Sequence, residues 1–175
     1  IYHLLNNPKL AIRCCKKLIE VKPEFAEAYN NLGVTYLREK KIIDALKSFK
    51  KATLLKPDYI EAINNLGFTY QEDTDFENAL LTFNKVLSID KNNLISLNNM
   101  GICYKKMGKF ETALKYYNDA LKVNPNYPSI HVNIGVIRVD ENKLPKAREC
   151  FNKALSINPI FTSALWNLLG TADTL

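Results

Sequence analysis

The chain contains 175 residues, enough for one ordinary domain or two small ones. Its composition, with 47% hydrophobic and 24% charged residues, is that of a folded protein and excludes a disordered tail. The formal charge of +6 is too small by itself to indicate nucleic acid binding, and no apolar run approaches the ~20 residues that cross a bilayer. We therefore expect no nucleic acid partner and no membrane insertion.

The cysteines and histidines show no pattern typical of a reactive site. None of the four cysteines form a Cys-x-x-Cys pair, and neither histidine has a cysteine or carboxylate at metal-ligand spacing. Free thiols in a reducing compartment fit this spacing better than disulfides, so the expected location is cytoplasmic or nucleocytoplasmic. Glycine-rich phosphate loops, His-Glu metal helices and nucleophile elbows are missing from the sequence. We predict no metal, no cofactor and no catalytic residue within this segment.

The most informative feature is a sequence pattern that recurs every 34 residues. The first block of the pattern occurs as AYNNLGVTY (28–36), AINNLGFTY (62–70), SLNNMGICY (96–104), IHVNIGVIR (130–138) and ALWNLLGTA (164–172). A second block keeps the same period, as DALKSFKKA (44–52), NALLTFNKV (78–86), TALKYYNDA (112–120) and KARECFNKA (146–154). A period of this length indicates an array of helical repeats rather than one globular core.

The period divides the chain into a single predicted array. Residues 1–25 hold the end of one repeat, with Ala11 and Cys15 at the positions of Ala45 and Phe49. Residues 162–175 begin a further repeat or form a capping helix. The full repeats between them are residues 26–59, 60–93, 94–127 and 128–161.

Each full repeat is predicted to contain two helices. Apolar residues recur at three- and four-residue spacing, as on one helix face, first at Tyr29, Leu32, Gly33 and Tyr36 and then at Ala45, Phe49 and Ala52. Prolines separate the helices. Pro8, Pro128 and Pro145 fit first-turn positions, whereas Pro57, Pro125 and Pro159 follow second helices. Lys91 takes this last position in the second full repeat, so we expect a softer boundary there.

A glycine inside each first helix indicates close helix packing. Glycine costs about 1 kcal/mol relative to alanine inside a helix, so it is retained where a neighbouring helix approaches closely. These glycines are Gly33, Gly67, Gly101 and Gly135. The expected facing residues on the second helices are Ala45, Ala79, Ala113 and Ala147.

The combination of Leu-Gly-x-x-Tyr, Ala-x-x-x-Phe-x-x-Ala and a following proline at this period resembles the tetratricopeptide repeat, over the whole chain. The resemblance implies an all-α fold, a right-handed superhelical solenoid of antiparallel helix pairs, with the first helices lining a concave groove. Two residues depart from the pattern. Arg138 replaces the tyrosine in the last full repeat, and Leu169 replaces the glycine in the final helix.

One polar column on the first helices is kept through every repeat. At 100° per residue, Glu27, Asn31, Val34 and Arg38 point away from the apolar face of their helix, so we expect them to be exposed. The column that starts at Asn31 continues unchanged as Asn65, Asn99, Asn133 and Asn167. We call these five residues the asparagine column. The neighbouring columns have diverged, to Val132 and Trp166 on one side of it.

The asparagine column suits the capture of a peptide backbone. An asparagine amide is both a donor and an acceptor, so it can pair with the N–H and C=O of an extended chain. A neighbouring apolar column is expected to receive side chains of the bound strand. This column consists of Val34, Phe68, Ile102 and Val136. The alternative interpretation is that the amides hydrogen-bond between neighbouring repeats, or hold only water.

The predicted function is a protein–protein interaction module that binds an extended peptide or protein segment. The asparagine column is similar to that of the repeat arm of nucleocytoplasmic protein O-glycosyltransferases, in which groove asparagines hold substrate backbone. The first alternative is therefore such an arm, with its catalytic domain outside this chain, and the second is a scaffold subunit. Apolar residues in 162–175 lack a covering helix, which predicts a homodimer through this segment.

Overall fold

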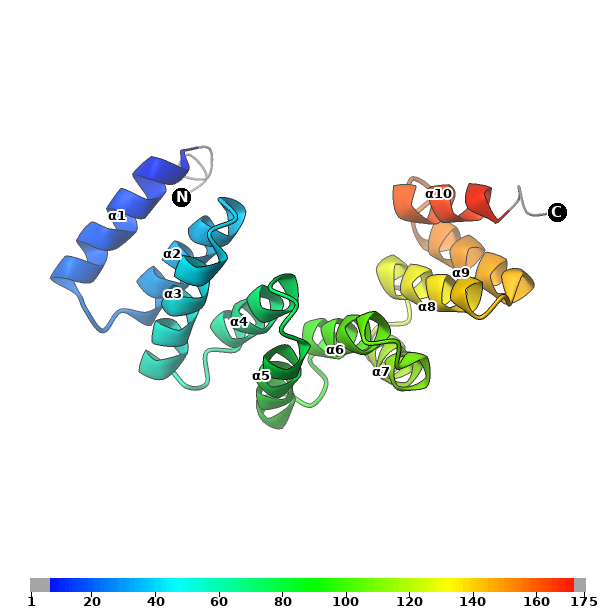
Figure 1. The fold of residues 1–175 in the computed structure, drawn as a ribbon, viewed down its shortest axis with the longest axis horizontal. Helices are drawn as coiled ribbons and strands as arrows, with labels where there is room; N and C mark the ends of the chain where they lie inside the picture. Colours follow the sequence, from blue (N-terminus) through cyan, green and yellow to red (C-terminus); the bar gives the residue numbers. More distant parts are fainter. Residues whose placement is uncertain (1–6, 172–175) are drawn as a thin grey trace. The chain divides into compact units, whose positions relative to one another are not determined.

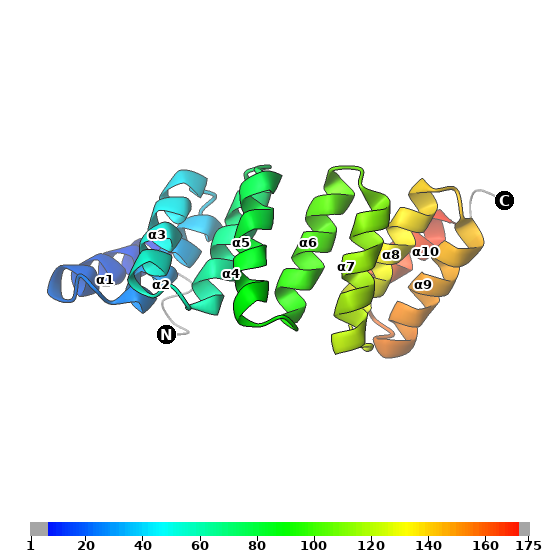
Figure 2. The same cartoon turned by 90° about the horizontal axis from the view of Figure 1, so that it is seen from below.

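The computed structural model describes residues 7–171 and shows an all-α array (Figures 1 and 2). These residues form ten helices and no strand. The helices are α1 (Pro8–Val21), α2 (Ala26–Arg38), α3 (Ile42–Leu55), α4 (Ile60–Glu72), α5 (Phe76–Ile89), α6 (Leu94–Lys106), α7 (Phe110–Val123), α8 (Pro128–Asp140), α9 (Leu144–Ile157) and α10 (Thr162–Gly170). None of these helices is long and apolar enough to cross a bilayer.

The helices group into two compact units. Unit 1 comprises Ile1–Lys91, and unit 2 comprises Asn92–Leu175. In unit 1, α2 packs against α3 and α4 against α5, with further contacts between α1 and α2, α3 and α4, and α2 and α4. In unit 2, α6 packs against α7 and α8 against α9, and α10 contacts both α8 and α9. First helices therefore lie beside first helices of the next repeat within each unit.

Each helix pair closes where a ring on the second helix fills the space beside a glycine on the first. A Cβ built on Gly67 would lie 2.6 Å from the Phe83 ring, and one on Gly33 would lie 2.7 Å from the Phe49 ring. The predicted close approach at these glycines is confirmed. The expected partner is wrong, because the nearest atoms belong to the aromatic residue four positions after each alanine. The alanines are nevertheless fully buried.

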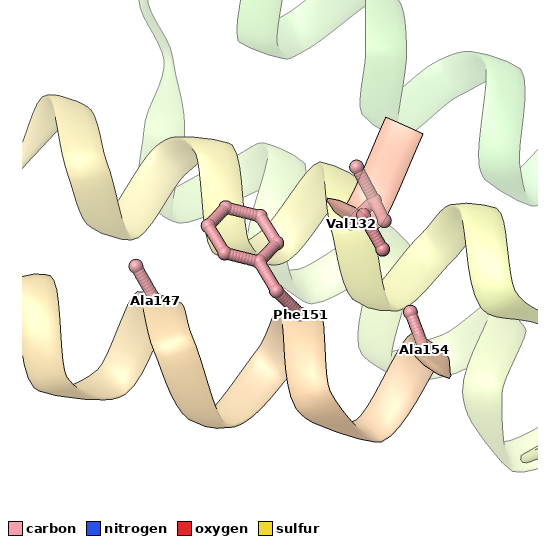
Figure 3. Packing of buried hydrophobic residues seen from close by; sticks show 5 residues of the cluster. Val132, Ala147, Phe151 and Ala154 are labelled. Atoms are coloured by element: carbon pink, nitrogen blue, oxygen red, sulfur yellow. The ribbon is translucent and has the colours of Figure 1, made fainter. Parts of the chain in front are cut away.

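The core of the last helix pair shows the same arrangement (Figure 3). Phe151 of α9 is fully buried, with Ala147 and Ala154 one turn to either side on the same helix. Val132 of α8 and Ala164 of α10 complete this cluster. Aromatic rings between small residues let neighbouring helices approach closely while the interior remains filled.

The helix boundaries follow the predicted signals. Pro8, Pro128 and Pro145 lie in the first turns of α1, α8 and α9. Between α5 and α6, where Lys91 replaces proline, the Asn93 side chain accepts a hydrogen bond from the Ser96 N–H at 3.1 Å and caps α6. Side-chain capping thus takes over part of the role of the missing proline.

The turn inside each repeat uses one residue with left-handed backbone. These residues are Lys40, Thr74, Gly108 and Asn142, with φ between 57° and 72°. The equal spacing shows that the turn geometry belongs to the repeat and is imposed on residues with very different intrinsic preferences.

Candidate peptide-binding site

The asparagine column lies at the surface of the first helices. Asn31 is exposed, and the other four members are half-buried. The Asn31 side chain forms no hydrogen bond with any residue in 7–171, so its amide N–H and C=O groups are available to a ligand. Each half-buried member uses part of its amide in hydrogen bonds to other groups of the protein.

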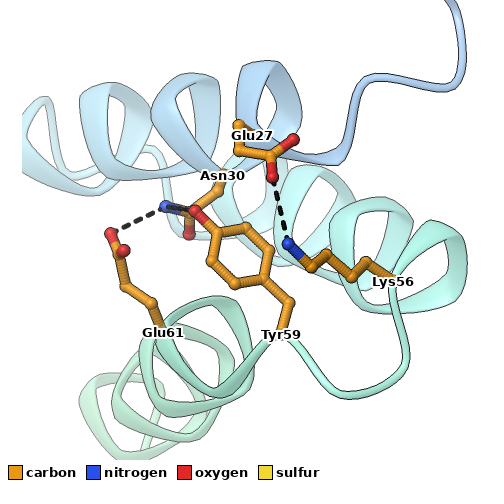
Figure 4. A network of polar contacts seen from close by, with 5 residues as sticks. All are labelled: Glu27, Asn30, Lys56, Tyr59 and Glu61. Atoms are coloured by element: carbon orange, nitrogen blue, oxygen red, sulfur yellow. Dashed lines mark hydrogen bonds and ion pairs between the residues drawn. The ribbon is translucent and has the colours of Figure 1, made fainter.

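In unit 1 the column is tied, through Asn65, to a polar network around the buried Asn30; Figure 4 shows this network. The Asn65 amide N–H donates to Oδ1 of Asn30 at 2.9 Å. Asn30 is fully buried, and its own amide donates to Glu61 Oε1 at 3.0 Å and to the Tyr59 hydroxyl at 3.4 Å. Glu27, expected to be exposed, is half-buried and forms an ion pair with Lys56 at 3.2 Å. Repeat-to-repeat hydrogen bonding, the alternative interpretation of the amides, therefore applies to Asn65.

In unit 2 the equivalent bonds are longer, and a lysine joins them. Asn133 donates to Asn98 Oδ1 at 3.4 Å, and Asn98 donates to Asn99 Oδ1 at 3.4 Å. The Lys105 ammonium donates to Asn133 Oδ1, also at 3.4 Å. These distances exceed those of strong hydrogen bonds, so a ligand could replace them at small cost.

The last member of the column bonds within its own helix. The Asn167 amide donates to the Ser163 backbone carbonyl at 2.7 Å. Asn167 also lines a recess of ≈ 290 Å³, which we call the unit 2 recess. Its lining residues are Val139, Trp166, Asn167, Gly170 and Thr171.

The predicted apolar column is less exposed than expected. Val34 packs beside the core cluster that contains Phe49, and Val136 packs beside the cluster that contains Phe151. Ile102 is half-buried, and only Phe68 is classed as exposed, with 38% of its surface accessible. Val34 and Val136 therefore stabilise helix packing as well as bordering the first-helix surface.

Phe68 lines the unit 1 recess, a depression of ≈ 590 Å³ between α2, α4 and the turn before α3. Its lining residues are Leu37, Arg38, Lys40, Ile42, Phe68 and Glu72. The side chains of Leu37, Ile42 and Phe68 make the recess apolar, and charged groups of both signs surround it. A recess of this kind suits one apolar side chain of a bound strand.

Burial shifts the pKa values of titratable groups near the column in both units. In unit 1, burial raises the pKa of Tyr59, and the Glu61 charge raises it further. In unit 2, burial lowers the pKa of Lys105, with a further contribution from Lys106 that Asp140 opposes. Burial also raises the pKa of the Cys103 thiol to about 12, so that thiol stays protonated and unreactive.

The described residues form neither a metal site nor a disulfide. All four cysteines are free thiols, and residues 7–171 contain no group of three side chains placed to hold a metal ion. The sequence missed Asn30 and Asn98, because their column changes to valine at residue 132. Covariation between repeats gave no signal for them, because Asn64 and Asn98 are kept although Ile95 and Ser129 replace the glutamate of this contact.

Comparison with known proteins identifies the family. The tetratricopeptide repeat matches residues 26–59, 60–93, 95–127 and 128–161. The chain belongs to the tetratricopeptide repeat family. No curated protein matches the chain significantly.

Several solved structures share the fold of this tetratricopeptide repeat protein. The structure of MamA has a TM-score of 0.79 and 23% identity, covering 90% of this chain and 92% of that one. The protein PilF from Pseudomonas aeruginosa has a TM-score of 0.84 and 20% identity, with coverage of 99% and 79%. The protein YrrB, described as a tetratricopeptide repeat protein with an unusual peptide-binding site, has a TM-score of 0.74 and 22% identity, with coverage of 99% and 87%. Identities this low establish a common fold only.

Proposed function

We propose that this chain is a protein–protein interaction module whose first helices bind an extended peptide or protein segment. The observation that carries the proposal is the unbroken asparagine column, which lies at the surface and keeps unused hydrogen-bonding groups. Asn31 keeps its whole amide, and the Asn99 amide N–H groups have no acceptor within residues 7–171. The peptide-binding site named for YrrB shows that a related fold can bind peptide.

The binding mode follows from the chemistry of the column. Amides that pair with main-chain N–H and C=O groups recognise an extended backbone without regard to its sequence. Side-chain preference then comes from the apolar positions, chiefly Phe68 in the unit 1 recess. Val34, Ile102 and Val136 border the same helices and complete the proposed contact set.

A titration tests the asparagine column. The probe is the blocked peptide Ac-Thr-Val-Thr-Gln-Thr-Val-Thr-NH2, which favours an extended conformation and carries no charge. Its binding to the isotope-labelled chain is followed by NMR. We expect the Asn31→Ala and Asn99→Ala double variant, which loses one amide in each unit, to bind about fivefold more weakly, because one lost amide pair is worth about 1 kcal/mol. These two amides were chosen because they form few internal bonds.

A matched control changes two exposed asparagines of second helices, Asn84→Ala and Asn118→Ala. This control should bind the probe as the wild-type chain does. Equal affinities of all three proteins, or no binding by any of them, would contradict the proposal.

Two alternatives rest on specific observations. The asparagine column also suits the substrate-recognition arm of a protein O-glycosyltransferase, and a glycosyltransferase domain elsewhere in the same gene would favour that role. Trp166 and Leu169 of α10 are 73% and 61% exposed, which suits a scaffold subunit that docks by this helix. The free thiols motivate the proposal of a cytoplasmic or nucleocytoplasmic location.

A further inference from the structure

The two units place opposite charges beside equivalent amide pairs that include a member of the asparagine column. Both contain the same linked amide pair, Asn65 with Asn30 in unit 1 and Asn133 with Asn98 in unit 2. These residues are 68 positions apart in sequence, which is two repeats. In unit 1 the pair ends at the Glu61 carboxylate, whereas in unit 2 it ends at an ammonium group.

Two substitutions between the repeats cause this difference. Ser129 occupies the position of Glu61, so the carboxylate is lost in unit 2. Lys105 occupies the position of Leu37, so an ammonium is gained there. Leu37 lines the unit 1 recess, and Lys105 reaches from α6 to Asn133 on the next first helix, α8. The same position therefore faces the peptide-binding side in both units.

Lys105 is poorly satisfied where it lies. Its ammonium carries three N–H donors, and the one hydrogen bond to a described residue is the long contact with Asn133. It forms no ion pair with a carboxylate of residues 7–171, and Asp140 acts on it only from a greater distance. A partly desolvated cation without a counter-ion gains most when a carboxylate arrives.

We propose that unit 2 binds an acidic side chain of the peptide at Lys105. The carboxylate of a glutamate or aspartate would accept hydrogen bonds from the Lys105 ammonium and from the second amide N–H of Asn133. The equivalent subsite of unit 1, with Leu37 and Phe68, takes an apolar side chain instead. This inference rests on the proposed peptide-binding function and adds its charge preference.

The experiment compares two blocked peptides that differ in one charge. These are the neutral probe Ac-Thr-Val-Thr-Gln-Thr-Val-Thr-NH2 and its counterpart with glutamate in place of glutamine. We expect the wild-type chain to bind the glutamate peptide about fivefold more tightly, as a charge-assisted hydrogen bond would produce. In the Lys105→Gln variant this preference should vanish while the neutral peptide still binds. Glutamine is tolerated at this position, because Gln71 occupies it in the preceding repeat.

Two further variants separate the local effect from net charge. Lys115→Gln removes the same charge from an exposed position on α7 and should keep the preference. Ser129→Glu restores the unit 1 carboxylate beside Asn98 and should weaken the preference, because the added negative charge repels the peptide glutamate.

The outcomes distinguish the inference from the function on which it rests. Equal binding of both peptides to the wild-type chain, or a preference that survives Lys105→Gln, would overturn the acidic subsite and leave the peptide-binding function standing. If neither peptide binds the wild-type chain, the proposed function is overturned, and the acidic subsite with it.

Discussion

At the scale of single residues, the glycine of each first helix sets how closely the two helices of a repeat approach. The space that a Cβ would occupy already contains ring atoms of the facing aromatic side chain. The ring is itself fully buried at Phe49, Phe83, Tyr117 and Phe151, so it has little room to move.

Gly67→Leu tests this packing. The new side chain would meet the Phe83 ring, so we expect the free energy of unfolding to fall by about 1–3 kcal/mol or more. Chemical denaturation measures the change. Gly170→Leu is the control, because within residues 7–171 no atom outside its own stretch of helix lies within 4 Å of the position of its Cβ, and it should change stability by less than about 0.5 kcal/mol. If the stability of Gly67→Leu is unchanged, α4 and α5 do not pack closely at Gly67 and the prediction is wrong.

Tyr117 has a hydroxyl group at a buried position that holds phenylalanine in the other full repeats. The equivalent residues are Phe49, Phe83 and Phe151, and the buried Tyr117 hydroxyl has no hydrogen-bond partner among the described residues. Burial also raises the pKa of Tyr117. Removing an unsatisfied buried hydroxyl recovers its desolvation cost, so Tyr117→Phe should raise stability by about 1 kcal/mol.

The reverse change supplies the control for this prediction. Phe83→Tyr adds the same hydroxyl at the equivalent buried position and should lower stability by about 1–3 kcal/mol. Thermal unfolding of both variants would measure the effect. A loss of stability in Tyr117→Phe would show that the hydroxyl is satisfied in solution.

At the scale of helices, neighbouring first helices are joined in two different ways. Asn30 of α2 meets Tyr59 and Glu61 at the start of α4 and makes a polar contact. The equivalent Val132 of α8 belongs to the apolar cluster against which Phe161, just before α10, packs, and Ser163 replaces the glutamate. Asn30 and Tyr59 are therefore both replaced by apolar residues at this contact.

Exchanging the central residues should destabilise both contacts. Asn30→Val would leave the Glu61 and Asn65 groups without their buried partner, and Val132→Asn would bury an amide among apolar atoms. Each should cost about 1–3 kcal/mol in urea denaturation. Adding Phe161→Tyr and Ser163→Glu to Val132→Asn recreates the unit 1 contact and should recover part of the loss. If Phe161→Tyr and Ser163→Glu only add to the loss of stability of Val132→Asn, the three positions do not act together and the prediction is wrong.

At the scale of the whole molecule, α10 exposes several large apolar side chains. Leu168 packs against the Phe151 cluster, so the preceding helix pair partly covers it. Leu165 and Leu169 are 40% and 61% exposed. The predicted homodimer interface extends over residues 162–175, of which 172–175 lie outside the described residues. Both the dimer and the organisation of residues 1–175 as one array stay predictions.

Introducing charged residues on α10 tests the predicted dimer. Leu165→Lys with Leu169→Glu disrupts the exposed face without touching the core, and we expect it to shift a dimer to monomer in light scattering. Leu54→Lys with Leu81→Glu makes the same changes at exposed leucines of second helices and should leave the association intact. A wild-type chain that stays monomeric at high concentration would contradict the prediction.

The sequence by itself determined the helices, their pairing and the repeat family. These depend on local signals: apolar spacing at one helix period, prolines at boundaries, and a glycine that marks close packing. Only the tertiary structure decided which polar column is buried, because side-chain burial depends on the rotation of each first helix against the next. Asn30 and Asn31 are adjacent in sequence, yet one is fully buried and the other exposed. The same rotation half-buries Val34 and carries Lys105 to Asn133, a contact between helices that no local pattern encodes.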